Sequence, residues 1–326
     1  MLSHDVDTIH GYKDVLRVAQ LEEKMDFRSC FNFVPERYGR VSLALLDQLR
    51  RRGFDVAVHG LKHDGKLFLS RCNFERQAPR INAYLKKWQT EGFTSPSMQR
   101  DLEWMAALNI DYSMSTFDTD PFEPQPDGVG TIFPFAVYKN CSEQSAFRAP
   151  QGPERGRRAV SSQRFGSRTQ YPEPSTQNPI SSSNSGNPSN STNPSNSVDS
   201  TNSMDPSNSR NSRSFFVELP YTLPQDSTLF VILQEKTIGI WKRKLDWIAE
   251  KGGMALLNTH SDYMNCVNGR CGLEEYPIRL YKEFLQYVKD KYEGQYWHVL
   301  PKQMANFWRE KMVVKANANE QDSSKL

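Results

Sequence analysis

The stretch Ser3-His4-Asp5-Val6-Asp7 ends a short apolar run at the start of the chain and predicts the carboxyl end of a β-strand. Side chains alternate between the two faces of a strand, so Asp5 and Asp7 project from one face and His4 from the other. We therefore expect two carboxylates on one face at the end of a strand, and a packed position for His4.

A second motif, HGLKH at residues 59–63, also follows an apolar run. Histidines four residues apart lie on the same side of a helical turn, so we expect the imidazoles of His59 and His63 to face the same way. If this pair meets Asp5 and Asp7 in space, the group supplies two nitrogens, one carboxylate ligand and a spare carboxylate. Such a set is typical of a catalytic metal site with open positions rather than of a closed structural site.

Short apolar runs alternate with helical patterns on both sides of the motifs. Strands are predicted at 1–7, 29–34, 54–58, 112–115, 215–219, 228–233, 254–257 and 296–300. Helices are predicted at 13–25, 41–52, 74–89, 99–108, 237–251, 277–292 and 301–312. This alternation predicts an α/β fold with a parallel sheet, and seven or eight such units favour a closed β/α barrel over an open sheet.

A polar tract interrupts the alternation from about residue 151 to 213. From Asn187 it repeats a six-residue unit that is rich in Asn, Pro and Ser and nearly free of apolar side chains. Such a tract cannot bury enough surface to offset the entropy lost on ordering, so we expect it to be disordered. The favoured interpretation is a long insertion within a single domain of residues 1–326, and a linker between two domains is the alternative.

The net charge of +3 gives no support for nucleic-acid binding, and no basic stretch is interleaved with aromatic residues. No run approaches the 18 apolar residues of a membrane span, and the start lacks the pattern of a signal peptide. We therefore expect a cytoplasmic chain without a membrane span, although a start assigned too late would hide an export signal.

The chain has five cysteines, an odd number that does not indicate a disulfide framework. Free thiols in a reducing compartment are the favoured interpretation. Cys266 and Cys271 bracket a turn-like Asn-Gly, so a disulfide or a thiolate pair on a metal is the alternative there.

Three candidate groups share one feature, because Asp5 with Asp7, His59, and His260 each lie at the end of a different predicted strand. Alone, the aspartate pair is better explained as a turn or helix cap, and the histidine spacing often marks nothing. In a β/α barrel, however, the carboxyl ends of the strands share one face, where active sites are found. The three placements together therefore favour one functional site. His298 lacks this support, and we expect it to be structural.

These residues resemble the motifs of the polysaccharide deacetylase family, the NodB-homology carbohydrate esterases. The resemblance rests on the segments SHDVD at 3–7, HGLKH at 59–63, GFTSP at 92–96 and LNTH at 257–260, with 112–120 in the place of a fourth motif. It lies on both sides of the polar tract, which supports a single split domain. The resemblance implies a distorted β/α barrel, here of about seven strands.

The resemblance also implies metal-dependent removal of an N- or O-acyl group. Carried over position by position, it makes Asp7, His59 and His63 the ligands of a divalent ion, most often zinc. It makes Asp5 the general base and His260 the general acid.

Other positions depart from the family pattern or extend it. Thr94 stands where the family usually has an arginine that tethers the catalytic aspartate, and a threonine cannot form that pair. Arg148 fits the arginine pattern, but it comes two predicted strands too late, so we favour Thr94 as the corresponding position. Pro96 and Asp262 complete the candidates for binding substrate or orienting other groups, and Asp262 either orients His260 or faces solvent.

The leading hypothesis is a hydrolase of amide carbon–nitrogen bonds that deacetylates a sugar or polysaccharide with the help of a divalent metal. One alternative is an amidohydrolase acting on non-sugar C–N bonds. Another is a carbohydrate-binding pseudoenzyme, because of Thr94 and because Asp5 follows only four residues of the first strand. The sugar and the oligomeric state are left open.

Overall fold

The computed structural model describes residues 1–119, 128–139, 215–267 and 270–323. These described residues belong to one compact unit. The expected insertion at 151–213 and the alternative residue Arg148 lie outside the described residues. The single-domain organisation therefore stays a prediction.

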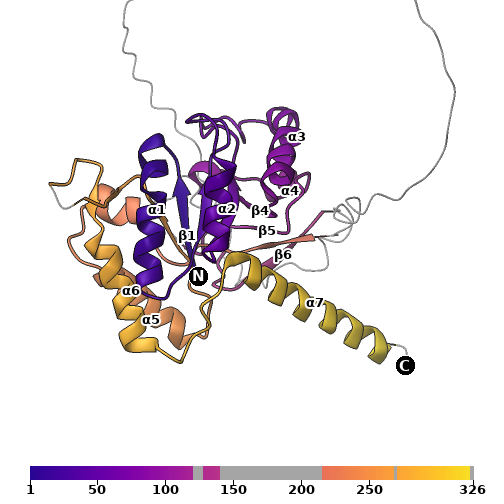
Figure 1. The fold of residues 1–326 in the computed structure, drawn as a ribbon. Coiled ribbons are helices and arrows are strands. Elements are labelled where there is room, and N and C mark those ends of the chain that lie inside the picture. The colour runs from indigo at the N-terminus through magenta and orange to yellow at the C-terminus, as the bar shows by residue number, and fades with distance from the viewer. Residues whose placement is uncertain (120–127, 140–214, 268–269, 324–326) are drawn as a thin grey trace, which may run out of the picture. The chain divides into compact units, whose positions relative to one another are not determined.

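The main element is a curled sheet of eight strands in the order β6-β7-β5-β4-β3-β2-β1-β8 (Figure 1). Neighbouring strands are parallel except β6 and β7, which are antiparallel. Among the described residues the two edge strands, β6 and β8, do not pair with each other. The sheet is therefore a distorted rather than a closed β/α barrel. The α/β prediction is confirmed. The strands are β1 (Leu2–Val6), β2 (Cys30–Phe33), β3 (Asp55–His59), β4 (Gly92–Thr94), β5 (Tyr112–Ser113), β6 (Phe135–Tyr138), β7 (Phe215–Glu218) and β8 (Leu257–His260).

Helices connect most of these strands, as the alternating pattern predicts. They are α1 (Ile9–Lys24), α2 (Leu43–Arg51), α3 (Arg71–Trp88), α4 (Leu102–Met105), α5 (Gly239–Glu250), α6 (Arg279–Tyr292) and α7 (Pro301–Ser323). A 3-10 turn, η1 (Pro96–Met98), follows β4, and a π-helical turn, η4 (Ser227–Ile232), follows β7. A small separate sheet pairs β9 (Met264–Asn265) with β10 (Tyr276–Pro277). No helix in the described part of the chain is long and apolar enough to span a membrane.

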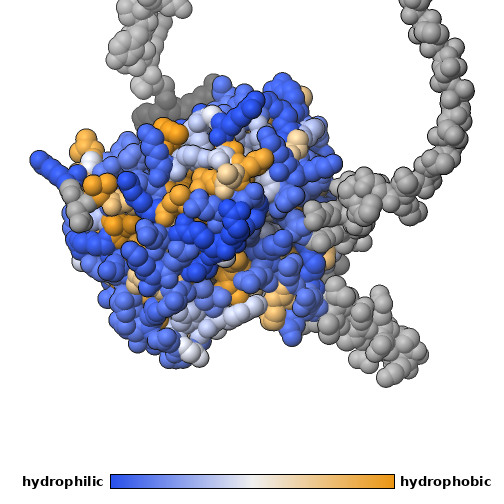
Figure 2. All heavy atoms as spheres, viewed as in Figure 1, coloured by the Kyte–Doolittle hydropathy of each residue, from blue (hydrophilic) through white to orange (hydrophobic). Residues whose placement is uncertain are grey.

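Local sequence explains where three of the helices begin. The hydroxyl groups of Thr8, Ser42 and Ser70 each accept a hydrogen bond from a backbone N–H of the first helical turn. This bond satisfies one of the donors that a helix start leaves unpaired. The helices α1, α2, α3, α5 and α6 bury apolar side chains on one face, and hydrophilic residues cover most of the face seen in Figure 2.

The two faces of the sheet differ in chemistry, and this difference places the site. Side chains such as Val6, Phe31 and Val58 belong to the large apolar core that also contains the buried faces of the helices. The alternate positions of the same strands carry polar groups, including Asp5 and Asn32, that contact one another on the other face. The concave side of the curled sheet is therefore polar where the candidate residues lie.

Three predicted strands are wrong or displaced. Residues 228–233 form η4 rather than a strand, because a short apolar run fits a buried helical turn as well as a strand. Residues 296–300 form no strand. The strand predicted at 254–257 is displaced toward the C-terminus and corresponds to β8. His260 is therefore the last residue of the strand and does not follow it at a distance of three residues.

Candidate metal centre

The candidate residues come from the carboxyl ends of neighbouring strands. Asp5 lies in β1 and Asp7 directly follows it, His59 ends β3, and His260 ends β8. β1 pairs with β8 in a register that sets Asp5 beside His260. The expectation that one edge of the barrel gathers these groups therefore agrees with the geometry.

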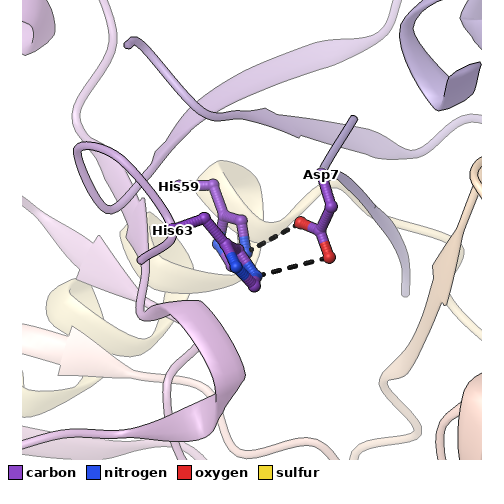
Figure 3. Close-up of side chains that lie close together, drawn as sticks. All are labelled: Asp7, His59 and His63. Atoms are coloured by element: carbon purple, nitrogen blue, oxygen red, sulfur yellow. Dashed lines mark ion pairs between the residues drawn. The ribbon is translucent and has the colours of Figure 1, made fainter. Parts of the chain in front are cut away.

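Asp7, His59 and His63 form a group that could hold a metal ion. Their potential ligand atoms all lie within 4.8 Å of one another. The Nε2 atom of His59 is 3.3 Å from Asp7 Oδ1, and the Nε2 atom of His63 is 3.3 Å from Asp7 Oδ2. Figure 3 shows both imidazoles facing the single carboxylate.

His63 reaches this position from a loop and not from the helical turn that its spacing predicts. Gly60 and His63 both have positive φ angles, of 59° and 53°, which bend the chain back toward β1. A Cβ atom on Gly60 would lie 2.3 Å from Cγ of Pro96, so glycine is required both by the angle and by the contact. Pro96 therefore shapes the turn that carries His63.

Thr94 contacts a candidate ligand. β3 and β4 pair so that Thr94 is the neighbour of His59, and Thr94 Oγ1 lies 2.6 Å from His59 Nδ1. With Nδ1–H donating to the hydroxyl, Nε2 keeps its lone pair toward Asp7. Such a bond fixes the ring and the tautomer of a metal-binding histidine.

The chemistry of this group fits a divalent cation. Asp7 Oδ1 is buried and has no hydrogen-bond donor among the described residues. It faces the lone pair of His59 Nε2, and two acceptors at this distance repel unless a proton or a cation lies between them. Burial acts to raise the pKa of Asp7, but His59 and His63, when their rings are protonated, outweigh it and hold that pKa well below its usual range. A bound cation would take the place of those ring protons. Two imidazoles and one carboxylate are a common ligand set of catalytic zinc sites.

Asp5 lies beside this group without joining it. Its Oδ2 atom is 3.8 Å from His59 Nε2 and 3.9 Å from His260 Nε2, beyond hydrogen-bond distance. Two buried amides hold it instead, since Asn32 Nδ2 donates to Oδ1 at 2.7 Å and Asn258 Nδ2 donates to Oδ2 at 2.9 Å.

His260 is oriented by Asp226, a residue that the sequence analysis missed. His260 Nδ1 lies 2.7 Å from Asp226 Oδ1, and the hydroxyl of Tyr276 donates to Asp226 Oδ2 at 3.0 Å. Burial opposes the charge of the ring, but Asp226 raises the pKa of His260 to about 10. The segment Pro224-Gln225-Asp226-Ser227 is typical of a helix start and could have indicated Asp226 as a capping residue. The strand predicted for the residues that follow, 228–233, obscured this pattern.

Asp262 takes neither of the two roles expected for it. Its carboxylate accepts hydrogen bonds from the backbone N–H groups of Asp7 at 2.8 Å, Thr8 at 2.8 Å and Gly11 at 3.2 Å. A Cβ atom on Gly11 would lie 2.3 Å from this carboxylate. Asp262 therefore fixes the backbone of a candidate ligand and the start of α1.

The other histidines and the cysteines follow the expectations. His4 is fully buried and bonded to Thr259 and Glu22, as its face of the strand predicts. His298 accepts a hydrogen bond from the backbone of Arg28, and burial lowers its pKa to about 4. The cysteines of the described residues, among them the pair after β9, are free thiols.

No protein family and no curated protein matches the sequence. Among solved structures, a candidate polysaccharide deacetylase from Mycobacterium smegmatis matches with a TM-score of 0.54 and 13% sequence identity. The match covers 95% of this chain and 90% of the mycobacterial one.

Two further structures match over shorter segments. A family 4 carbohydrate esterase from Streptomyces lividans in complex with acetate has a TM-score of 0.27 and 13% identity, over 32% of this chain and 55% of its own. A peptidoglycan deacetylase from Bacillus subtilis has a TM-score of 0.30 and 17% identity, over 37% of this chain and 59% of its own. The fold assignment therefore rests on the mycobacterial structure. The chain has the fold of that candidate polysaccharide deacetylase, as the resemblance of its motifs predicts.

Proposed function

We propose that this chain is a metal-dependent deacetylase that hydrolyses the N-acetyl or O-acetyl group of a sugar or polysaccharide. The observation that carries the proposal is the placement of Asp5 and His260 beside the group formed by Asp7, His59 and His63. A candidate ligand set, a carboxylate outside that set and a charged imidazole, all within one group of polar side chains, are the components of metal-assisted amide hydrolysis. The shared fold and the motif resemblance support the same reaction.

Asp7, His59 and His63 would hold the ion, and zinc is the ion that best suits this ligand set. A divalent ion bound there supplies Lewis acidity toward the acetyl carbonyl and toward the attacking water. The protein keeps the ligands in place through Thr94, which bonds His59, and Asp262, which bonds the backbone of Asp7.

Asp5 and His260 divide the proton transfers between them. Asp5 is fixed by amide N–H donors and accepts the proton of the attacking water as the general base. His260 is charged at neutral pH, because Asp226 raises its pKa to about 10, and it donates a proton to the leaving nitrogen or oxygen. Opposite environments for the two groups are what an acid–base pair requires.

The test is acetate release from acetylated oligosaccharides by purified protein supplied with zinc. We expect turnover by the wild type, and a loss of at least about 100-fold in Asp5→Asn, because the amide cannot accept the proton. Asp246→Asn makes the same chemical change at a carboxylate that bonds Tyr287 and Tyr292 between α5 and α6, and it should keep full activity.

Two outcomes would contradict the proposal. Release of ammonia from ureides without release of acetate from sugars would indicate an amidohydrolase of another substrate class. Binding of oligosaccharide without stoichiometric metal or turnover would indicate a carbohydrate-binding protein.

A further inference from the structure

Asp5 is held by two neutral amides, one on each oxygen. Asn32 and Asn258 are both fully buried, and their Nδ2 atoms lie 2.7 Å and 2.9 Å from Oδ1 and Oδ2 of Asp5. Asp5 itself is 5% exposed, so water replaces these donors poorly. Each carboxylate oxygen thus accepts from one amide, and Asn258 Nδ2 also donates to Gln225 Oε1 at 3.4 Å.

A separate buried donor sets the direction of each amide. An asparagine can turn either its nitrogen or its oxygen toward a neighbour. The hydroxyl of Ser3 donates to Asn258 Oδ1 at 2.9 Å, and the thiol of Cys30 donates to Asn32 Oδ1 at 3.3 Å. Burial raises the pKa of the Cys30 thiol well above its usual value, so it stays a donor. Both amide nitrogens are therefore directed at Asp5.

The register of the strands produces this arrangement. Ser3 is the neighbour of Cys30 on one side and of Asn258 on the other, one layer below Asp5. Asn32 lies beside Asp5 in the layer above. Inward-facing side chains of a β/α barrel form such layers, and here the lower layer orients the amides that bond the upper one.

The amides compete with the imidazole of His260 for Asp5. Without them, attraction would draw the carboxylate toward the charged ring of His260, whose Nε2 atom is 3.9 Å from Asp5 Oδ2. A direct ion pair with this ring would occupy a lone pair that a general base needs. The two N–H donors keep Asp5 at a distance from it.

We propose that Asn32 and Asn258 are positioning residues that hold Asp5 for proton transfer, and that Cys30 and Ser3 fix the direction of the two amides. This inference rests on the deacetylase function proposed above. The residues act through Asp5 and need not contact the substrate.

The first test is kinetic. Asn32→Leu and Asn258→Leu keep the approximate size of the side chain and remove the donor. Each should lower kcat by on the order of 10- to 100-fold, while KM and bound metal stay near the wild-type values. Thr259→Val is the matched control. Thr259 lies next to Asn258 in β8, and its substitution removes a buried hydrogen bond to His4 of β1 but should keep kcat. The proposal would be overturned if Asn32→Leu and Asn258→Leu fold, bind metal and keep the wild-type kcat.

A pair of variants at Cys30 tests the orienting step if the leucine variants do not fold. Cys30→Ala removes the donor to Asn32 and should lower kcat severalfold. Cys30→Ser restores a hydroxyl donor and should recover most of the loss. Equal kcat values for Cys30→Ala and the wild type would show that the thiol does not orient the amide.

A readout without turnover separates this inference from the proposed function. In protein labelled with ¹⁵N at asparagine, the side-chain amide signals of Asn32 and Asn258 should exchange slowly with solvent. Asp5→Ala should shift both signals, and Asp246→Asn should shift neither. If the wild type releases no acetate, the deacetylase proposal fails, and unchanged signals in Asp5→Ala would independently refute the contact.

Discussion

The contact between Asp226 and His260 determines in which pH range the proposed acid is charged. Asp226 raises the pKa of His260 to about 10 from its ordinary 6.5, against the effect of burial. The stabilisation that this pair gives the folded chain is therefore complete below pH 6.5 and is lost as the pH rises through about 10.

Asp226→Asn should move the alkaline limit of activity to lower pH. The amide keeps the size of the side chain but removes the charge, so the pKa of His260 falls from about 10, because only Asp7 and Asp5 then oppose the effect of burial. We expect the variant to retain far more activity at about pH 6 than at about pH 9, relative to the wild type. Profiles of kcat/KM against pH measure this. An unchanged alkaline limit would show that Asp226 does not control the ring, and Asp246→Asn serves as the control.

Thr94→Val should weaken metal binding. Valine keeps the shape of the side chain but cannot accept from His59 Nδ1, so the ring loses its fixed orientation. Loss of such a partner lowers metal affinity by about 10- to 100-fold. Competition with a chromophoric chelator measures the affinity. Thr90→Val removes a buried hydroxyl that bonds the backbone of Val56 in β3, and it should leave the affinity unchanged. Equal affinities in the two variants would contradict the role of Thr94.

Single residues were predictable to the extent that their chemistry is visible in a short motif. Asp7 and His59 stand at strand ends with a regular spacing, so sequence alone brought them together. Asp226 was not predictable in this way, because its partner is 34 residues away and the residues that follow it, 228–233, were predicted as a strand rather than as the helical turn that Asp226 begins. Asp262 was visible, but its backbone partners near the N-terminus depend on a strand pairing that no local pattern contains.

Among the elements, the turn between β3 and α3 has the most specific requirement. Gly60→Ala should destabilise the protein and weaken metal binding, since the left-handed angle costs about 1–2 kcal/mol and the methyl group meets Pro96. Gly65 also has a positive φ, of 71°, but has no atom within 4 Å of the position of a Cβ. Gly65→Ala should therefore lower the free energy of unfolding only by the cost of the left-handed φ angle. Urea unfolding and chelator competition measure both effects, and equal losses in the two variants would contradict the contact.

Helices were predicted better than strands in this chain. A helix such as α2 buries Leu46 and Leu49 on one face and begins at a serine cap, and both features are visible in the sequence. The strands have two to five residues, and a short apolar run does not distinguish a strand from a buried helical turn. The misplaced strand at 228–233 is of this kind, whereas residues 296–300 form neither a strand nor a helix.

At the scale of the whole molecule, bound metal should link parts of the fold that are distant in sequence. Adding zinc should raise the thermal midpoint, because an ion at about 100-fold above its dissociation constant stabilises the folded state by about 2.7 kcal/mol. A chelator should reverse the shift. Asp7→Asn should abolish it, since the group that could hold the ion loses its carboxylate. A zinc-dependent shift that persists in Asp7→Asn would place the ion elsewhere.

The general architecture was predictable because alternation of strands and helices restricts a chain to few arrangements. Whether the barrel closes was not predictable from this alternation, because closure depends on whether the two edge strands pair with each other. One of these edge strands, β6, runs antiparallel to its neighbour β7, which the alternating pattern does not indicate. The gathering of candidate residues at one edge follows from parallel pairing, which is why the candidate metal centre could be anticipated and its supporting contacts could not.

The pairing of β1 with β8 sets an order of events during synthesis. Asp7, His59 and His63 leave the ribosome within the first 63 residues, whereas Asn258 and His260 follow only after the polar tract. The nascent chain can thus present all three candidate ligands, with one edge of β1 still unpaired, long before it has the proposed proton donor. We expect ribosome-stalled chains that end before β8 to be incapable of turnover. The order of translation would then determine when the proposed active site is complete.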